Sequence, residues 1–171
     1  MVCSKSRLAK KNLSIPTLEL VAAHMTSNLV SNVECSIDMV KVSSVHCWSD
    51  STVALLWLNG QGEYRQFVSN RVAKIKERDH IQWHHVPTED NPADLGSRGS
   101  KCVKNQLWRN GPNGLVDPGT WPPNIVLEPS PESSAKVKTL EKFLLPPPRQ
   151  RESRTSSISC CKLILFREYF R

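Results

Sequence analysis

Three acidic residues in the first hundred positions stand where α/β proteins commonly place their chemistry. Glu19 lies near the start of a predicted helix, Asp50 ends a predicted strand, and Asp94 opens a predicted short helix. Strand ends and helix starts meet at one edge of an α/β sheet. Carboxylate oxygens gathered there are ligands for hard divalent cations. Two such ions activate a water molecule and stabilise the leaving oxygen of a phosphodiester.

A purely structural interpretation of these acids stands beside the metal-site interpretation. Glu19 and Asp94 both fall in the predicted first turn of a helix, where a negative charge complements the helix dipole. Asp50 precedes Ser51 and is a candidate helix cap. The spacing alone leaves both interpretations open.

The hydrophobic pattern of residues 1–100 predicts the elements that would position these acids. Ser14 and Pro16 are the start signal of a helix whose apolar residues then recur at helical spacing. We expect strands at 2–8, 45–50 and 81–86, and helices at about 16–31, from 51 or 52 onward, at about 66–78, and from 92 onward. This alternation predicts the α/β class.

Composition divides the chain into three parts. Residues 1–100 are patterned as a folded domain, 101–125 form a Trp/Pro/Gly-rich extension, and 126–171 read as a disordered basic tail. Residues 1–132 hold 14 Lys and Arg against 13 Asp and Glu, whereas residues 133–171 hold 9 against 3. The net charge of +7 therefore belongs almost entirely to the tail.

Cysteine usage and hydropathy bear on the location of the protein. The six cysteines form no C-x-x-C pair, so we expect free thiols and no structural zinc site. The N-terminus lacks the apolar core of a secretory signal, and no apolar run approaches the roughly 20 residues of a membrane span. We expect an intracellular protein of the cytoplasm or nucleus, with no membrane partner.

Five ordered segments of the chain resemble one family. They are similar, in order, to the ribonuclease H-like region of BEL/Pao-type LTR retrotransposon polyproteins, the Pao retrotransposon family, over roughly residues 2–125. The segments are SKSRLAKKNLSIPTLELVAA (4–23), WSDSTVALLWL (48–58), FVSNRVAKI (67–75), WHHVPTEDNPADLGSRG (83–99), and LWRNGPNGL (107–115) followed by WPP (121–123).

The resemblance implies a fold, a substrate and a site. The implied fold is that of ribonuclease H, a five-stranded sheet flanked by helices with a two-magnesium site that degrades the RNA strand of an RNA–DNA hybrid. The catalytic and metal-binding acids carried over are Glu19 of the LEL motif, Asp50 of the SDS motif and Asp94 of the NPAD motif. The cofactor implied is Mg²⁺, and the partner is an RNA–DNA hybrid or another nucleic acid.

The chain also departs from the family pattern. The family has a further Asp on its first strand, ahead of the SKSR segment, and this chain begins at Met1. We therefore expect an incomplete ribonuclease H-like fold that lacks the first two strands, binds Mg²⁺ weakly and is inactive alone. One expectation is that the strand at 2–8 pairs with the Asp50 strand; the alternative is that the Asp50 strand keeps an unpaired edge that favours association. Another polypeptide is a further candidate source of the missing strands.

Other residues offer weaker indications. Arg71, Arg98 and His85 are candidates for nucleic-acid contact, although each arginine is equally suited to pairing with a carboxylate. Trp48 and its counterparts at 57 and 83 are expected to pack in the core or on the sheet. The alternative function is that of a non-catalytic protein that binds nucleic acid or another partner through the remnant fold and the basic tail. The sequence of the tail is also explained as chance sequence, translated by read-through from a degraded element.

Overall fold

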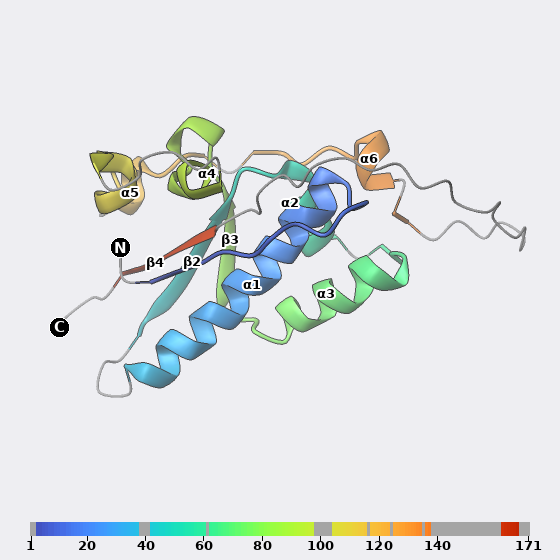
Figure 1. Ribbon diagram of the computed structural model, residues 1–171, viewed down its shortest axis with the longest axis horizontal. Coiled ribbons are helices and arrows are strands. Elements are labelled where there is room, and N and C mark those ends of the chain that lie inside the picture. Colours follow the sequence, from blue (N-terminus) through green and yellow to red (C-terminus); the bar gives the residue numbers. More distant parts are fainter. Residues whose placement is uncertain are drawn as a thin grey trace, which may run out of the picture.

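A computed structural model shows an α/β arrangement of short strands and helices (Figure 1). The α/β class predicted from the hydrophobic pattern is thereby confirmed. The structure describes residues 3–37, 42–60, 62–97, 104–115, 117–123, 125–134 and 136–137, together with the backbone of 162–167.

Four strands form one sheet in the order β1-β4-β2-β3. They are β1 (Ser4–Lys5), β2 (Ser44–Ser49), β3 (Ile81–His85) and β4 (Lys162–Arg167). Strands β2 and β3 are parallel, and β4 is antiparallel to both of its neighbours. The parallel pair matches the strands predicted at 45–50 and 81–86, and in β2 the buried Val45 and Cys47 alternate with the half-buried His46 and Trp48.

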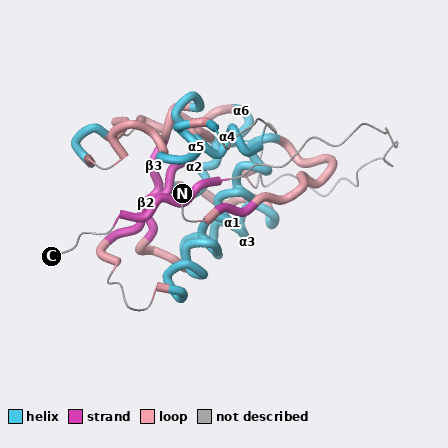
Figure 2. Tube along the Cα trace, turned by 60° about the vertical axis from the view of Figure 1, so that its left-hand side comes forward, coloured by secondary structure: helices cyan, strands magenta, loops and turns pink. Residues whose placement is uncertain are grey.

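The helices lie beside these strands and at the upper end of the sheet, as Figure 1 shows and a turned view repeats (Figure 2). They are α1 (Ile15–Ser36), α2 (Thr52–Asn59), α3 (Gln66–Lys76), α4 (Pro92–Ser97), α5 (Gln106–Asn110) and α6 (Pro131–Ser134), with 3-10 turns at Thr88–Asp90 and Pro118–Thr120. In both views α1 and α3 lie beside the strands, while α4 and α5 lie above the upper end of the sheet.

Helix α1 starts as predicted but runs past the predicted end at residue 31. Ser14 is its N-cap and Pro16 lies in its first turn. The apolar periodicity ends near Val30, yet the following residues include no Gly or Pro to stop the helix. The last turn is therefore a polar extension that ends at Ser36.

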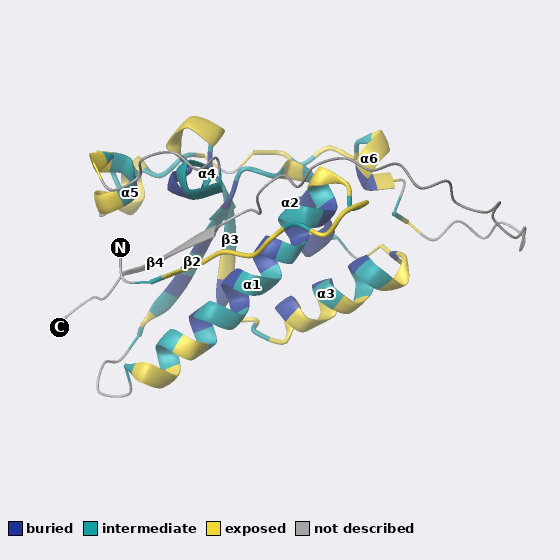
Figure 3. Ribbon diagram, viewed as in Figure 1, coloured by how far each residue is buried: buried dark blue, intermediate teal, exposed yellow. Residues whose placement is uncertain are grey.

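The core lies where α1, α2 and α3 meet the inner face of the sheet (Figure 3). One cluster joins the three helices and a second joins α1 to β2 and β3, with Trp83 packed against both. The first contains Leu20, Ala23, Trp57, Leu58, Tyr64, Val68, Val72 and Ile75, and the second contains Val30, Val45, Cys47 and Ile81. The expectation that Trp57 and Trp83 pack in the core is confirmed.

The predicted pairing of the first strand with the Asp50 strand is wrong. Strand β1 pairs with β4, and β4 pairs with β2, so that Ser44 faces Arg167 and Ser4 faces Leu163. Strand β1 has only two residues, whereas β4 has six and lies along most of β2. The longer strand satisfies more of the backbone groups on that edge of β2.

Part of the segment expected to be a disordered tail packs against the folded helices. Helix α6 begins at Pro131, the Trp57 Nε1–H donates to the Ser133 carbonyl at 3.2 Å, and Tyr64 forms a bridge with Val137. The structure thus differs from the expectation at these residues, and residues 138–161 lie outside the described part of the chain. Within the described residues, no helix is both long and apolar enough to cross a membrane.

Candidate functional site

The three predicted site acids come from elements that meet at one end of the sheet. The first half of α1, the end of β2 and the start of α4 all lie toward the upper end of Figure 1. The Val86 N–H donates to the Ser49 carbonyl at 3.1 Å, so the parallel ladder continues to the residue just before Asp50. The carboxyl ends of parallel strands are where α/β folds place their sites.

The local settings of the three acids differ from one another. Helix α1 begins at Ile15 and has no acid in its first turn, so the prediction that Glu19 complements the helix dipole there is wrong. Asp94 does lie in the first turn of α4, as predicted. The cap of α2 is Ser51, whose Oγ accepts from the Ala54 N–H at 3.2 Å, and not Asp50.

All three carboxylates are half-buried and take part in interactions with other residues. As a donor set they suit a hard divalent cation such as Mg²⁺. In the described part of the chain, however, no three His, Cys, Asp or Glu side chains are grouped so that they could hold a metal ion. The shared two-ion site formed by Glu19, Asp50 and Asp94 therefore stays a prediction.

A cluster of aromatic rings covers the outer face of the sheet below this edge. His46 and Trp48 of β2 and His84 of β3 lie on that face, and Trp121 of the extension packs edge-on against all three rings. His46 Nδ1 and His84 Nε2 are 3.0 Å apart. Burial, followed by the neighbouring His84, lowers the pKa of His46.

A cavity of about 300 Å³ opens between this aromatic face and the extension. Sequence reasoning missed this cavity, although it identified residues 101–125 as a Trp/Pro/Gly-rich extension. The signal was the alternation of His46 and Trp48, which puts both rings on the same face of one strand. The partner of that face, Trp121, comes from a segment without regular periodicity, so no pattern pointed to the contact.

The candidate nucleic-acid contacts do not form one group. Arg71 lies on α3, its guanidinium stacks 3.5 Å from the Phe67 ring centroid, and its Nη1 donates to the Phe67 carbonyl. His85 is the last residue of β3 and is half-buried. Arg98 lies outside the described residues. The positions of these residues thus do not decide whether they contact nucleic acid.

Cationic residues gather where the N-terminal segment approaches α3. Arg7 and Arg71 both line a small crevice, and burial together with the Arg7 charge lowers the pKa of Arg71. Burial also lowers the pKa of His24, and the positive charges of Arg71, Lys74 and Arg78 lower it further. We call the surface formed by Arg7, Arg71 and Lys74 the cationic strip.

The fold defines an α/β domain in which α1, β2 and α4 converge at the carboxyl ends of the parallel strands. These elements carry Glu19, Asp50 and Asp94, and we call this end of the sheet the acidic edge. Residues 1–51 match the family of the Pao retrotransposon-like RNaseH-like domain. The match confirms the resemblance over these residues, which run from β1 through α1 to the end of β2 and include Glu19 and Asp50. No curated protein and no solved structure matches the chain.

Proposed function

We propose that this chain presents the acidic edge of a ribonuclease H-like domain to an RNA–DNA hybrid and does not hydrolyse the RNA strand by itself. The family match and the convergence of α1, β2 and α4 support the nucleic-acid substrate class. The observation that carries the lack of activity is the position of β4 beside the Asp50 strand.

Strand β4 occupies the sheet position next to β2, on the side opposite β3. Its sequence is KLILFR, which contributes no carboxylate to the acidic edge. Because β4 is antiparallel to β2 and Cys47 faces Ile164, continuing that register brings Lys162 to the level of Ser49. The end of β4 that lies beside the Asp50 end of β2 therefore supplies no acid for a divalent cation, so we propose weak Mg²⁺ binding.

A cleavage assay tests the proposed lack of activity. The full chain in excess over a labelled RNA–DNA hybrid, with Mg²⁺ or Mn²⁺, is expected to leave the RNA strand intact. Cleavage that disappears in the Asp50→Asn variant would show that the chain is an active nuclease. An Asp79→Asn variant serves as the control, because Asp79 is an exposed acid between α3 and β3.

The cationic strip favours a second candidate function, binding of nucleic acid without hydrolysis. Arg7, Arg71 and Lys74 come together from two elements, and no ion pair to a carboxylate is seen for them among the described residues. Basic residues attract the phosphate backbone and release its counterions, so this binding weakens steeply with salt.

Fluorescence anisotropy with a labelled hybrid tests this second candidate at several salt concentrations. Reversing two charges of the strip, in the Arg7→Glu/Lys74→Glu variant, is expected to weaken binding and reduce its salt dependence. The Lys104→Glu/Lys136→Glu variant, which reverses two charges outside the strip, is the matched control. Equal loss of binding in both variants would assign the effect to net charge and not to the strip.

A further inference from the structure

A tightly bonded loop holds Trp121 against the sheet. The Trp121 Nε1–H donates to the Leu115 carbonyl at 3.2 Å, and the Thr120 hydroxyl donates to the carbonyls of Gly114 and Asp117. Gly114 has a φ of +85°, a conformation that favours glycine. These contacts fix the position of the indole without help from a regular helix or strand.

Trp121 and Trp48 form two walls of the cavity on the outer face of the sheet. Their ring centroids are 5.1 Å apart and the ring planes are nearly perpendicular, at 88°. Five prolines, Val86 and Leu115 supply most of the remaining lining. The cavity is therefore lined by two indole rings and by apolar surface, with few polar groups.

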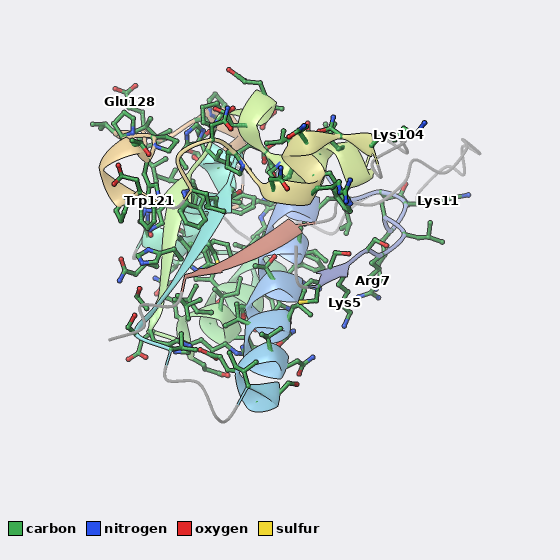
Figure 4. The ribbon with its side chains drawn as sticks, turned by 90° about the vertical axis from the view of Figure 1, so that its left-hand side faces the viewer. Lys5, Arg7, Lys11, Lys104, Trp121 and Glu128 are labelled. Atoms are coloured by element: carbon green, nitrogen blue, oxygen red, sulfur yellow. The ribbon has the colours of Figure 1, made fainter. Side chains whose placement is uncertain are left out.

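Among the described residues that line the cavity, Asp90 is the one charged residue, although the chain as a whole is basic. Residues 86–97 and 111–123, which provide nearly all of the lining, contain three acids and one acid respectively and no Lys or Arg. Asp90 lines the cavity, is exposed, and its carboxylate makes no hydrogen bond or ion pair within the described residues. Figure 4 shows Trp121 on one side of the molecule and Lys5, Arg7, Lys11 and Lys104 on the other.

We infer that this cavity binds an organic cation, an alkylated ammonium or a guanidinium group, such as a modified lysine or an arginine of a peptide presents. The face of an indole attracts a cation through the ring quadrupole, and the Asp90 carboxylate adds an opposite charge at the rim. A nucleic-acid phosphate is disfavoured here, because the walls carry only negative charge. The inference is independent of the proposed function at the acidic edge.

Calorimetric titration of the full chain with choline and with its neutral isostere, 3,3-dimethyl-1-butanol, tests the inference. The two probes have the same shape, so their difference reports the positive charge. We expect choline to bind about tenfold more tightly or better, as the attraction between a cation and an aromatic ring predicts. N-acetyl-trimethyllysine amide and N-acetyl-arginine amide then distinguish the two peptide sources.

Variants locate the site. Asp90→Asn is expected to weaken choline binding about threefold or more, because it removes the rim charge. Trp121→Leu is expected to abolish choline binding, but this variant can also loosen the loop. The Asp90→Asn variant avoids this problem, because Asp90 is exposed and its replacement leaves the loop intact. Trp108→Phe and Asp79→Asn are the matched controls outside the cavity lining.

Three outcomes would overturn the inference. Equal affinity for choline and its neutral isostere would show that the cavity binds apolar groups and does not recognise positive charge. Tighter binding of adenosine than of choline, lost in Trp121→Leu, would make it a base-stacking site. Absence of binding by every cationic probe at tens of millimolar would remove the site altogether.

Discussion

The Trp57 indole donates its Nε1–H to the Ser133 carbonyl oxygen at 3.2 Å, and this buried bond joins residues 76 positions apart. Trp57 is 1% exposed and belongs to the core cluster between α1, α2 and α3. Ser133 lies outside residues 1–100, the part of the chain patterned as a folded domain, so the bond attaches a distant segment to the core.

Replacing this tryptophan tests how much the buried bond contributes. Trp57→Phe removes the donor, leaves the Ser133 carbonyl without it and opens a small cavity. We expect a loss of about 2–4 kcal/mol in the free energy of unfolding, measured by urea denaturation. Trp108→Phe, at a half-buried position in α5, is expected to cost about 1 kcal/mol or less. Similar losses in both variants would contradict a special role for the bond.

A glycine exchange tests the loop that holds Trp121. Gly114→Ala adds a Cβ at a φ of +85°, in close contact with the Thr120 hydroxyl. We expect the loop to lose roughly 1 kcal/mol or more, seen as faster hydrogen exchange of the Trp121 indole proton. Gly119→Ala is the control, because Gly119 has no positive φ. The explanation fails if the Gly119 variant loosens the indole equally.

The lowered pKa values of two histidines predict that the free energy of unfolding falls under mildly acidic conditions. The pKa values of His46 and His24 are lowered in the fold, first by burial, so the unfolded chain binds protons more readily than the folded one. Stability from these groups is complete above their ordinary pKa of about 6.5 and is lost as the pH falls below it, through the folded values. Thermal unfolding at pH 8 and pH 5 measures the effect.

The His24→Gln/His46→Gln double variant identifies the source of this pH dependence. We expect a smaller drop in unfolding temperature between pH 8 and pH 5 than in the unaltered chain, since neither glutamine gains a proton. A drop of unchanged size would assign the acid sensitivity to other groups.

Two cysteines are expected to differ in reactivity. Burial, followed by the charge of Glu34, raises the pKa of the Cys47 thiol to about 12, whereas Cys35 is exposed at the end of α1. Because the thiolate is the reactive form, iodoacetamide should label Cys35 in the native protein well before Cys47. Mass spectrometry of timed digests measures both rates, and prompt labelling of Cys47 would show that β2 opens readily.

Local sequence signals predicted the elements of the first hundred residues well. Ser14 with Pro16, and Ser51 ahead of a leucine-rich run, are start signals that depend only on neighbouring residues. The alternation in β2 predicted its two faces, because side chains in a strand point to opposite sides in turn.

The remaining features depend on contacts between distant segments, which local patterns do not encode. The residue opposite Ser44 is Arg167, and Trp121 reaches the aromatic face from a loop that lacks periodicity. The site acids were found by type and position, yet their mutual distances depend on how α1, β2 and α4 pack together. The sequence pattern predicts the end of the sheet at which each acid lies, but it does not determine the distances between the carboxylates.

The insertion of β4 between β1 and β2 has a consequence for the order in which the protein matures on the ribosome. Strands β2 and β3 can associate soon after both have been synthesised, since only α2, α3 and short turns separate them. The backbone groups of β2 that β4 will satisfy remain exposed until a segment far along the chain has emerged. During that interval the nascent protein presents a hydrogen-bonding edge that a cotranslational chaperone is suited to shield.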